Sequence, residues 1–264
     1  MECVKQGAFI QFLTGAAQDL SGADAMAVAE KLVIRGRGGA GFPLLEKMQI
    51  CKAHDGEKTA VCNAFGALEC LAAWLARNGA WAVASGLRMA GKAVGAEKLV
   101  IYYNADDAAA AAALQAAAGE DIQLAAGPDR LSSGEESIML SVLRGEPPIS
   151  HIRPPYPAQT GILVQSAETL AALAYGAATG EKADKLLYVS GAVEKPGIVE
   201  APAGMSGEAL LACAGGMKEE EMVVIGQLIA DVIKNRDAAL ERSDKKVLEL
   251  TKSFPLYAND VIDD

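Results

Sequence analysis

The stretch Arg35-Gly36-Arg37-Gly38-Gly39-Ala40-Gly41-Phe42-Pro43 places four glycines within six positions, together with two arginines and a closing proline. Apolar spacing over 24–33 predicts a helix before it. Proline is favoured in the first turn of a helix, so Pro43 and the Leu-Leu-Glu-Lys-Met-Gln-Ile that follows predict a second helix. The sequence therefore predicts a segment of nearly bare main chain between two helices.

This arrangement suits anion binding. Glycines let main-chain N–H groups approach a phosphate without a Cβ in the way, and the positive end of the following helix adds attraction. Arg37 and Lys47 can supply full charges. The alternative, which so short a motif favours when taken alone, is a simple turn between helices. The segment is neither a P-loop nor the dinucleotide-binding fingerprint, because no strand is predicted before it.

Composition limits the classes of function. The 264 residues are 51% hydrophobic and 22% charged, which is typical of a globular protein with one large domain or two. A net charge of −10 argues against nucleic-acid binding. The beginning of the sequence does not resemble a secretory leader, and charges interrupt its apolar runs. We therefore expect a cytoplasmic protein without membrane spans.

Cysteine and histidine usage predicts no metal site. The five cysteines are Cys3, Cys51, Cys62, Cys70 and Cys213, and none forms a CxxC pair. Their odd number and scattered positions argue against a disulfide framework or a zinc site. An iron–sulfur cluster normally needs four close thiolates, so buried reduced cysteines are the better interpretation. His54 and His151 are too few for a histidine-based metal centre.

Strand patterns alternate with helix patterns along the next part of the chain. Apolar runs predict strands over 59–63, 98–103 and 121–125 and a short strand or turn over 161–165, with helices over 8–13, 68–77, 80–94, 105–118 and 166–174. This order predicts an α/β fold with a parallel sheet and a ligand site at the carboxyl ends of the strands. Asn63 lies at such an end, although a turn-forming asparagine explains it equally well.

Two further segments carry polar residues. Ser133-Gly134-Glu135-Glu136 precedes a helix predicted to end at Leu143, and its Ser-x-x-Glu spacing is that of a capping box. Alternatively, the two carboxylates face a ligand. The segment 145–157 has five prolines in thirteen positions, so it cannot pair within a sheet. It therefore presents Arg153 and Tyr156 on a stiff, extended main chain.

The carboxyl-terminal part is predicted to be separate, with a boundary near 178–182. A hairpin over 185–200, a helix over 206–212 and a strand over Met222–Ile225 predict a β-grasp-like unit. One long charged helix is expected from Gln227 to about Leu250, with an apolar stripe that needs a covering surface. The predicted divisions are an arm over 1–21, domains over 22–180 and 181–226, and a charged helix and tail over 227–264.

Taken in order, these motifs resemble the NADH-binding flavoprotein subunit of respiratory complex I and of related NAD-linked hydrogenases and formate dehydrogenases. The resemblance covers about residues 22–226 and is carried by the glycine segment, Gly134-Glu-Glu-Ser-Ile-Met-Leu, Arg153-Pro-Pro-Tyr-Pro and Glu168-Thr-Leu. It implies a Rossmann-like flavin-binding domain, then a small soluble-ligand-binding β-grasp (SLBB-like) domain and a C-terminal helix. The membrane-bound Rnf complex contains a more distant relative with the same two modules.

The resemblance also implies site residues. FMN would be held by the glycine segment and Lys47, and the paired glutamates would face flavin and nicotinamide. Phe42 and Tyr156 would stack on adenine, with Arg153 in place of a lysine. The implied cofactor-binding residues are Gly36, Arg37, Gly38, Gly39, Ala40, Gly41, Phe42, Lys47, Asn63, Glu135, Arg153, Tyr156, Gln165 and Ser166, with Glu136 as the catalytic residue.

The sequence departs from the family at three places. Phe65-Gly-Ala-Leu replaces an acidic run after the Asn-Ala, and Gln165-Ser166-Ala167 replaces an Asn-Asn pair. Losing a hydrogen-bonding acid at a hydride-transfer site typically costs on the order of a few kcal/mol. The four-cysteine iron–sulfur domain of the family is missing from this sequence, and the charged helix takes its place.

Two functions follow as hypotheses. The first is an FMN-dependent NADH:acceptor oxidoreductase subunit that takes hydride from NADH and passes single electrons to a partner iron–sulfur protein or another subunit of a redox complex. No iron–sulfur cluster is expected in this chain. The second is a divergent scaffold or ligand-binding subunit of a redox complex that has lost flavin or NADH chemistry. The glycine segment with Lys47 favours the first, and Phe65 favours the second.

Overall fold

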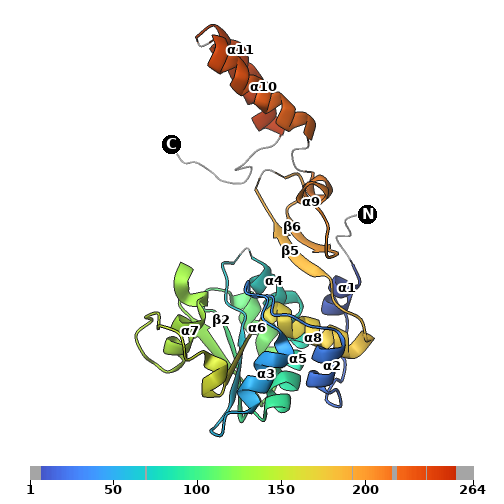
Figure 1. Ribbon diagram of the computed structural model, residues 1–264, viewed down its shortest axis with the longest axis vertical. Coiled ribbons are helices and arrows are strands. Elements are labelled where there is room, and N and C mark those ends of the chain that lie inside the picture. The colour runs from blue at the N-terminus through green and yellow to red at the C-terminus, as the bar shows by residue number, and fades with distance from the viewer. Residues whose placement is uncertain (1–6, 69, 192, 216–218, 236, 254–264) are drawn as a thin grey trace. The chain divides into compact units, whose positions relative to one another are not determined.

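The computed structural model describes residues 7–68, 70–191, 193–215, 219–235 and 237–253 (Figure 1). The chain divides into two compact units, one spanning residues 7–183 and the other beginning at Asp184. Each unit is described by itself below. Among the residues described, no helix is both long enough and apolar enough to span a bilayer.

The larger unit alternates helices and strands as predicted. Its elements are α1 (Ala8–Thr14), α2 (Ala25–Lys31), α3 (Leu44–Lys52), β1 (Thr59–Asn63), α4 (Leu71–Asn78), α5 (Ala80–Val94), β2 (Lys98–Asn104), α6 (Ala108–Ala118), β3 (Ile122–Gly127), η1 (Leu131–Gly134), α7 (Glu136–Leu143), η2 (Pro157–Thr160), β4 (Ile162–Ser166) and α8 (Ala167–Thr179). Helix α6 begins later than predicted because the Asp107 carboxylate caps it, accepting a hydrogen bond from the N–H of Ala110.

The four strands form one parallel sheet in the order β3-β2-β1-β4. The chain moves outward from β1 through β2 to β3 and then returns to the other side of β1. The direction of winding therefore reverses between β1 and β4, and in an open α/β sheet this switch point is where ligands bind. Asn63 and Ser166 are paired in register at the carboxyl ends of these two strands.

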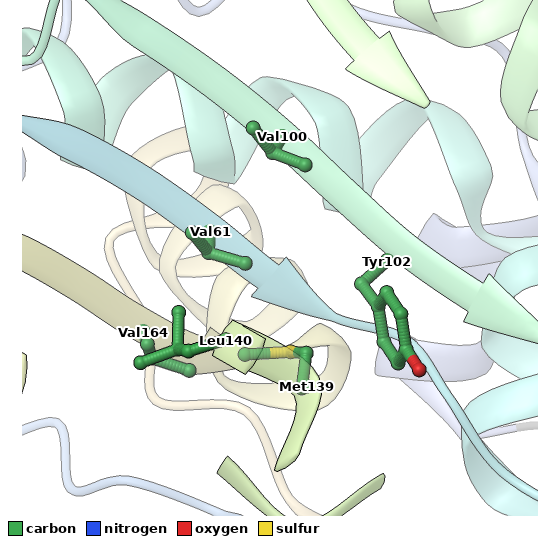
Figure 2. Packing of buried hydrophobic residues seen from close by; sticks show 6 residues of the cluster. All are labelled: Val61, Val100, Tyr102, Met139, Leu140 and Val164. Atoms are coloured by element: carbon green, nitrogen blue, oxygen red, sulfur yellow. The ribbon is translucent and has the colours of Figure 1, made fainter. Parts of the chain in front are cut away.

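Helices cover both faces of the sheet. Helices α5 and α8 pack together on one face, so closely that a Cβ added to Gly86 would lie 2.0 Å from the main-chain oxygen of Leu170. Helix α7 covers the other face. There, the buried residues that form the core cluster come from alternate strand positions and from α7: Val61, Val100, Tyr102, Met139, Leu140 and Val164 (Figure 2). This packing fixes α7 beside the switch point.

The smaller unit begins with an antiparallel hairpin of β5 (Lys185–Val189) and β6 (Gly197–Ala201), followed by α9 (Gly207–Ala214). The Ser206 hydroxyl caps α9 by accepting a hydrogen bond from the N–H of Ala209. Val189, Val199 and Ala214 form a small buried core. The hairpin and the helix were predicted, and their positions follow the turn residues and the serine cap.

The strand predicted over Met222–Ile225 is wrong, because these residues lie within helix α10 (Glu219–Asn235). A short apolar run does not distinguish a strand from part of a helix, and acidic residues at the helix start favour the helix. The single long helix predicted from Gln227 is also wrong. Helix α11 (Asp237–Ser253) lies beside α10 (Figure 1), and Arg242 and Asp231 form an ion pair at 2.6 Å between them. The predicted tail beyond residue 253 lies outside the described residues.

Candidate functional site

A cavity of about 370 Å³ lies at the carboxyl ends of β1 and β4, within the size range of about 300–1,000 Å³ typical of small-molecule pockets. It is lined by Gly36, Gly38, Ala40, Gly41, Phe42, Lys47, Asn63, Gly134, Glu135, Glu136, Arg153, Val164, Gln165 and Ser166. The structure therefore brings together most of the predicted site residues. Arg37, Gly39 and Tyr156 are the predicted residues that do not line it, whereas Gly134 and Val164 line it without having been predicted.

The glycine segment forms a narrow loop at one wall. The N–H of Gly36 donates to the main-chain oxygen of Phe42 at 2.8 Å, which closes the loop at its base. Gly39 and Gly41 have φ values of +116° and +64°, a region that residues with a side chain rarely adopt. A Cβ at either position would meet no described atom within 4 Å. The loop therefore presents open main chain, as anion binding requires.

The side chain of Arg37 does not enter the cavity. Its Nη1 lies 3.0 Å from Oε1 of Glu168, and its guanidinium lies over the ring of Phe9, 5.8 Å from the centroid. The main-chain N–H of Arg37 donates to the Thr169 hydroxyl at 2.8 Å. The loop is thus attached to the first turn of α8, and the predicted positive charge of Arg37 faces away from the site.

Lys47 brings its charge to the cavity from the first turn of α3. Its Nζ donates to the main-chain oxygen of Val164 at 2.8 Å and lies 3.2 Å from Oε1 of Glu136. Because Val164 lies in β4 and Glu136 begins α7, this ammonium connects three elements. A lysine has three donors, so a further hydrogen bond remains open to a ligand.

Glu135, Glu136 and Arg153 form a charged cluster at the opposite wall. Arg153 donates to Glu135 and to Glu136, each at 2.9 Å. Glu135 is the N-cap of α7 and accepts hydrogen bonds from the N–H groups of Ser137 and Ile138. The predicted capping box is therefore wrong. Ser133 lies in η1, two residues before the N-cap, and the Glu135 carboxylate rather than the serine hydroxyl accepts the hydrogen bonds of the helix end.

The environment of Glu135 holds its pKa below the ordinary value. Burial acts in the opposite direction and would raise the pKa. Hydrogen bonds from the Ser137 hydroxyl and from the N–H groups of Ile138 and Ser137, together with the Arg153 charge, outweigh it. Glu135 therefore stays ionised well into acidic solution, with its carboxylate fixed by α7.

The proline-rich segment is anchored to α7 by two serines that sequence reasoning missed. The Ser137 hydroxyl accepts a hydrogen bond from the N–H of His151 at 3.0 Å, and the Ser141 hydroxyl lies 2.9 Å from Nε2 of the same histidine. Two serines four residues apart share one face of a helix, and this spacing was the available signal. The anchors place Arg153 beside the glutamates, while Tyr156 is 55% exposed outside the cavity.

The strand ends supply the floor of the cavity. Asn63 donates to the main-chain oxygen of Gly134 at 2.8 Å and accepts from the N–H of Phe65 at 3.2 Å, so it both forms a turn and fixes η1. Gln165 is only 5% exposed, and its Nε2 has no hydrogen-bond partner among the described residues. A buried amide without a partner is unusual. Gln165 contributes to the cavity lining, but this nitrogen itself is not accessible from the cavity.

Phe65, which occupies the start of the family's acidic run, does not line the cavity. Its ring stacks on Tyr102 with centroids 5.5 Å apart, and it packs against the core cluster covered by α7. The residue therefore serves the core rather than the site. Among the described residues, no group of three or more histidine, cysteine, aspartate or glutamate side chains is placed to hold a metal ion.

Comparisons with known protein families identify both units. Residues 29–175 match the family model of the Nuo51 FMN-binding domain, which contains the cavity and covers more than half of the chain. Residues 186–230 match the SLBB domain. The model of the first family spans the glycine loop, α3, the strands and α7, and therefore every element that lines the cavity.

Curated relatives are identical to this chain at about a quarter of the aligned positions. One subunit of the NADH-quinone oxidoreductase of Aquifex aeolicus is 26% identical over 71% of this chain and 53% of its own length. The HndC protein of the NADP-reducing hydrogenase of Solidesulfovibrio fructosivorans is 26% identical over 74% and 47%. Cobalamin reductase PduS of Salmonella typhimurium is 28% identical over 84% and 48%. The chain thus spans about half the length of these relatives.

A solved structure shares the fold. A chain of an NAD+-reducing [NiFe]-hydrogenase in its air-oxidized state superposes with a TM-score of 0.72 and 26% identity. The match covers 80% of the present chain and 43% of the hydrogenase chain.

Proposed function

Since the chain belongs to the Nuo51 FMN-binding domain family, we propose that its cavity binds FMN and accepts hydride from a nicotinamide nucleotide. The observation that carries the proposal is the meeting of an open glycine loop and the Lys47 ammonium in one cavity at the switch point. Main-chain N–H groups and an ammonium are both donors, and the phosphate of flavin mononucleotide offers acceptors for them.

The residues present fit this ligand. The main chain of the glycine loop lacks a Cβ at Gly38 and Gly41, both of which line the cavity, so a phosphate can lie against its N–H groups. Lys47 adds a donor with full charge. FMN, when bound, supplies a centre that accepts a hydride as a two-electron unit and releases single electrons.

The protein's own contribution would be binding and orientation. Both oxygens of Glu136 are held before a ligand arrives, one by Lys47 and the other by Arg153. A carboxylate fixed in this way can orient the nicotinamide ring without reorganising, which is the form of pre-organisation that lowers reaction barriers. Asn63 fixes the position of Gly134 and therefore of the glutamates beside it.

The destination of the electrons is part of the proposal. The names of the relatives describe different reactions: one is an NADH-quinone oxidoreductase subunit, one belongs to an NADP-reducing hydrogenase, and one is a cobalamin reductase. We propose that this chain passes single electrons to a partner electron-transfer protein with an iron–sulfur centre, as a soluble subunit of a cytoplasmic redox complex. NADH is the proposed donor, and the smaller unit is proposed to be an SLBB domain that contributes to assembly.

Phe65 supports a second candidate function. Its ring packs on Tyr102, so the cavity has no carboxylate at the start of the acidic run that the family uses. A subunit that binds flavin or another ligand without oxidising NADH would need no acid there. Under this alternative the chain is a ligand-binding or scaffold subunit of a redox complex.

A visible spectrum separates these candidates. The full chain is purified, incubated with FMN, passed through a desalting column and scanned, and NADH is then added without oxygen. The proposal predicts a retained yellow cofactor that NADH bleaches. A yellow protein that NADH does not bleach would favour the second candidate. A colourless protein that retains no added FMN would refute flavin binding altogether.

A further inference from the structure

Arg37 carries a positive charge within the glycine loop, yet its guanidinium is directed into the protein. Only 12% of its side chain is exposed, and its partner Glu168 is 4% exposed. A buried carboxylate that loses its partner pays a large desolvation penalty, so this pair is not free to exchange Glu168 for a ligand. Arg37 is therefore placed to act on the loop from behind rather than on the ligand.

Several contacts hold this one residue. Nη1 donates to Glu168, Nη2 donates to the main-chain oxygen of Ala183, and the guanidinium lies over the Phe9 ring. The main-chain N–H is taken by the Thr169 hydroxyl. Glu168 and Thr169 both belong to the first turn of α8, so side chain and main chain of residue 37 are attached to the same turn.

The attachment adds to the contacts within the loop, where the N–H of Gly36 donates to the main-chain oxygen of Phe42 and Nε of Arg35 donates to that of Gly41 at 3.0 Å. Gly36, Gly38, Gly39 and Gly41 have the greatest conformational freedom of any residues, and Arg37 lies among them. The bonds from α8 thus constrain residue 37, which those two bonds within the loop do not involve. Ser166, which lines the cavity, caps the same helix, and a Cβ on Gly38 would lie 3.8 Å from the Cβ of Ser166.

We propose that Glu168 is a positioning residue that acts through Arg37 to fix the glycine loop in its anion-binding shape. This inference rests on the proposed function for the identity of the ligand. It assigns Glu168 a role in selectivity, because the loop would contact the phosphate group and not the flavin ring. Riboflavin has the same ring without the phosphate. A change in the loop should therefore alter the affinity for FMN but not the affinity for riboflavin.

The test is Glu168→Gln, which keeps the shape of the side chain and removes its charge. If Arg37 were itself a phosphate ligand, this change would free its charge and tighten FMN binding. The positioning role predicts the opposite: the dissociation constant for FMN rises about tenfold while that for riboflavin changes less than about twofold. Unchanged or tighter FMN binding would overturn the proposal, as would equal weakening of both ligands.

The matched control is Asp107→Asn. Asp107 is a 3% exposed carboxylate paired with Arg77 at 2.8 Å, and neither residue lines the cavity. Asp107→Asn, like Glu168→Gln, removes the charge of a buried carboxylate that is paired with an arginine. The affinities for FMN and for riboflavin should therefore change by the same factor or not at all. If this control altered the FMN-to-riboflavin ratio as much as Glu168→Gln, the selective role of Glu168 would be refuted.

Hydrogen exchange provides a readout without flavin. In the unliganded protein, Glu168→Gln should speed amide exchange across residues 35–43, and Asp107→Asn should not. Unchanged exchange in that segment would contradict the positioning role, even if the wild-type protein bound no FMN. Failure of wild-type FMN binding alone would instead refute the proposed function.

Discussion

Nζ of Lys47 lies 3.2 Å from Oε1 of Glu136, which joins α3 to α7 across the wall of the cavity. Both side chains are about three-quarters or more buried, at 24% and 21% exposure, so solvent screens this pair less than a surface pair. The same ammonium also holds the edge of β4 through Val164. One lysine therefore orients the proposed catalytic carboxylate and offers a charge to the ligand.

Lys47→Ala should weaken FMN retention by about 10- to 100-fold, the range expected for losing a hydrogen bond to a charged group. The dissociation constant can be measured by fluorescence quenching of the flavin. Lys98→Ala is the control, because Lys98 is 66% exposed and lies 3.6 Å from Glu57, outside the cavity lining. Equal retention in the two variants would count against the assignment of Lys47.

Glu135→Gln should lower the melting temperature near pH 7. A carboxyl group with a depressed folded-state pKa stabilises the protein above its ordinary pKa of 4.5, and this contribution is lost as the pH falls through the lower folded value. The difference in melting temperature between wild type and variant should therefore shrink as the pH is lowered below about 4.5. A difference that stays constant from pH 7 to pH 3 would disprove this origin.

Gly86→Ala should destabilise the larger unit by about 1–3 kcal/mol, as overpacking does. The new methyl group would lie 2.0 Å from the main-chain oxygen of Leu170, and a backbone atom cannot move aside without shifting α8. Gly226→Ala is the comparison, because a Cβ within α10 meets no described atom within 4 Å and should favour its helix. Urea denaturation followed by circular dichroism measures both.

Phe65→Asp should lower stability rather than restore family chemistry. The substitution removes a ring stacked on Tyr102 and places a charge against the core cluster, where burial without a partner is costly. Leu68→Asp introduces the same charge nearby at a residue that is 42% exposed, and its effect should stay within about 0.5 kcal/mol. Thermal unfolding that gave equal losses for both variants would contradict the packing role of Phe65.

The sheet could be predicted from the sequence because each strand is a short apolar run bounded by turn residues. Thr59–Asn63 forms a strand with the predicted bounds, and the switch point follows from where β4 joins β1. Met222–Ile225 is also a short apolar run, yet it is helical. The difference lies in its neighbours: the run is embedded in helix-favouring residues and is too short to show its own periodicity.

The sequence allowed most residues of the site to be predicted, but not the direction in which each side chain points. A glycine loop and paired glutamates are visible in a sequence, whereas the direction of a side chain depends on distant partners. Arg37 turns away from the cavity because it forms an ion pair with Glu168. Glu168 lies more than a hundred residues further along the chain, so the pair could not be predicted from the sequence around Arg37. Glu135 rather than Ser133 caps α7 because Ser133 is part of η1 and the helix begins only at Glu136. Neither contact leaves a local pattern.

The position of β4 next to β1 has a consequence for how the protein matures. During synthesis β1, β2 and β3 emerge in the order in which they pair, but the cavity also needs Val164, Gln165 and Ser166 from β4. A nascent chain that ends after β3 has the glycine loop and Lys47 yet lacks the opposite wall. Under the proposed function, FMN binding therefore requires that β4 has emerged from the ribosome.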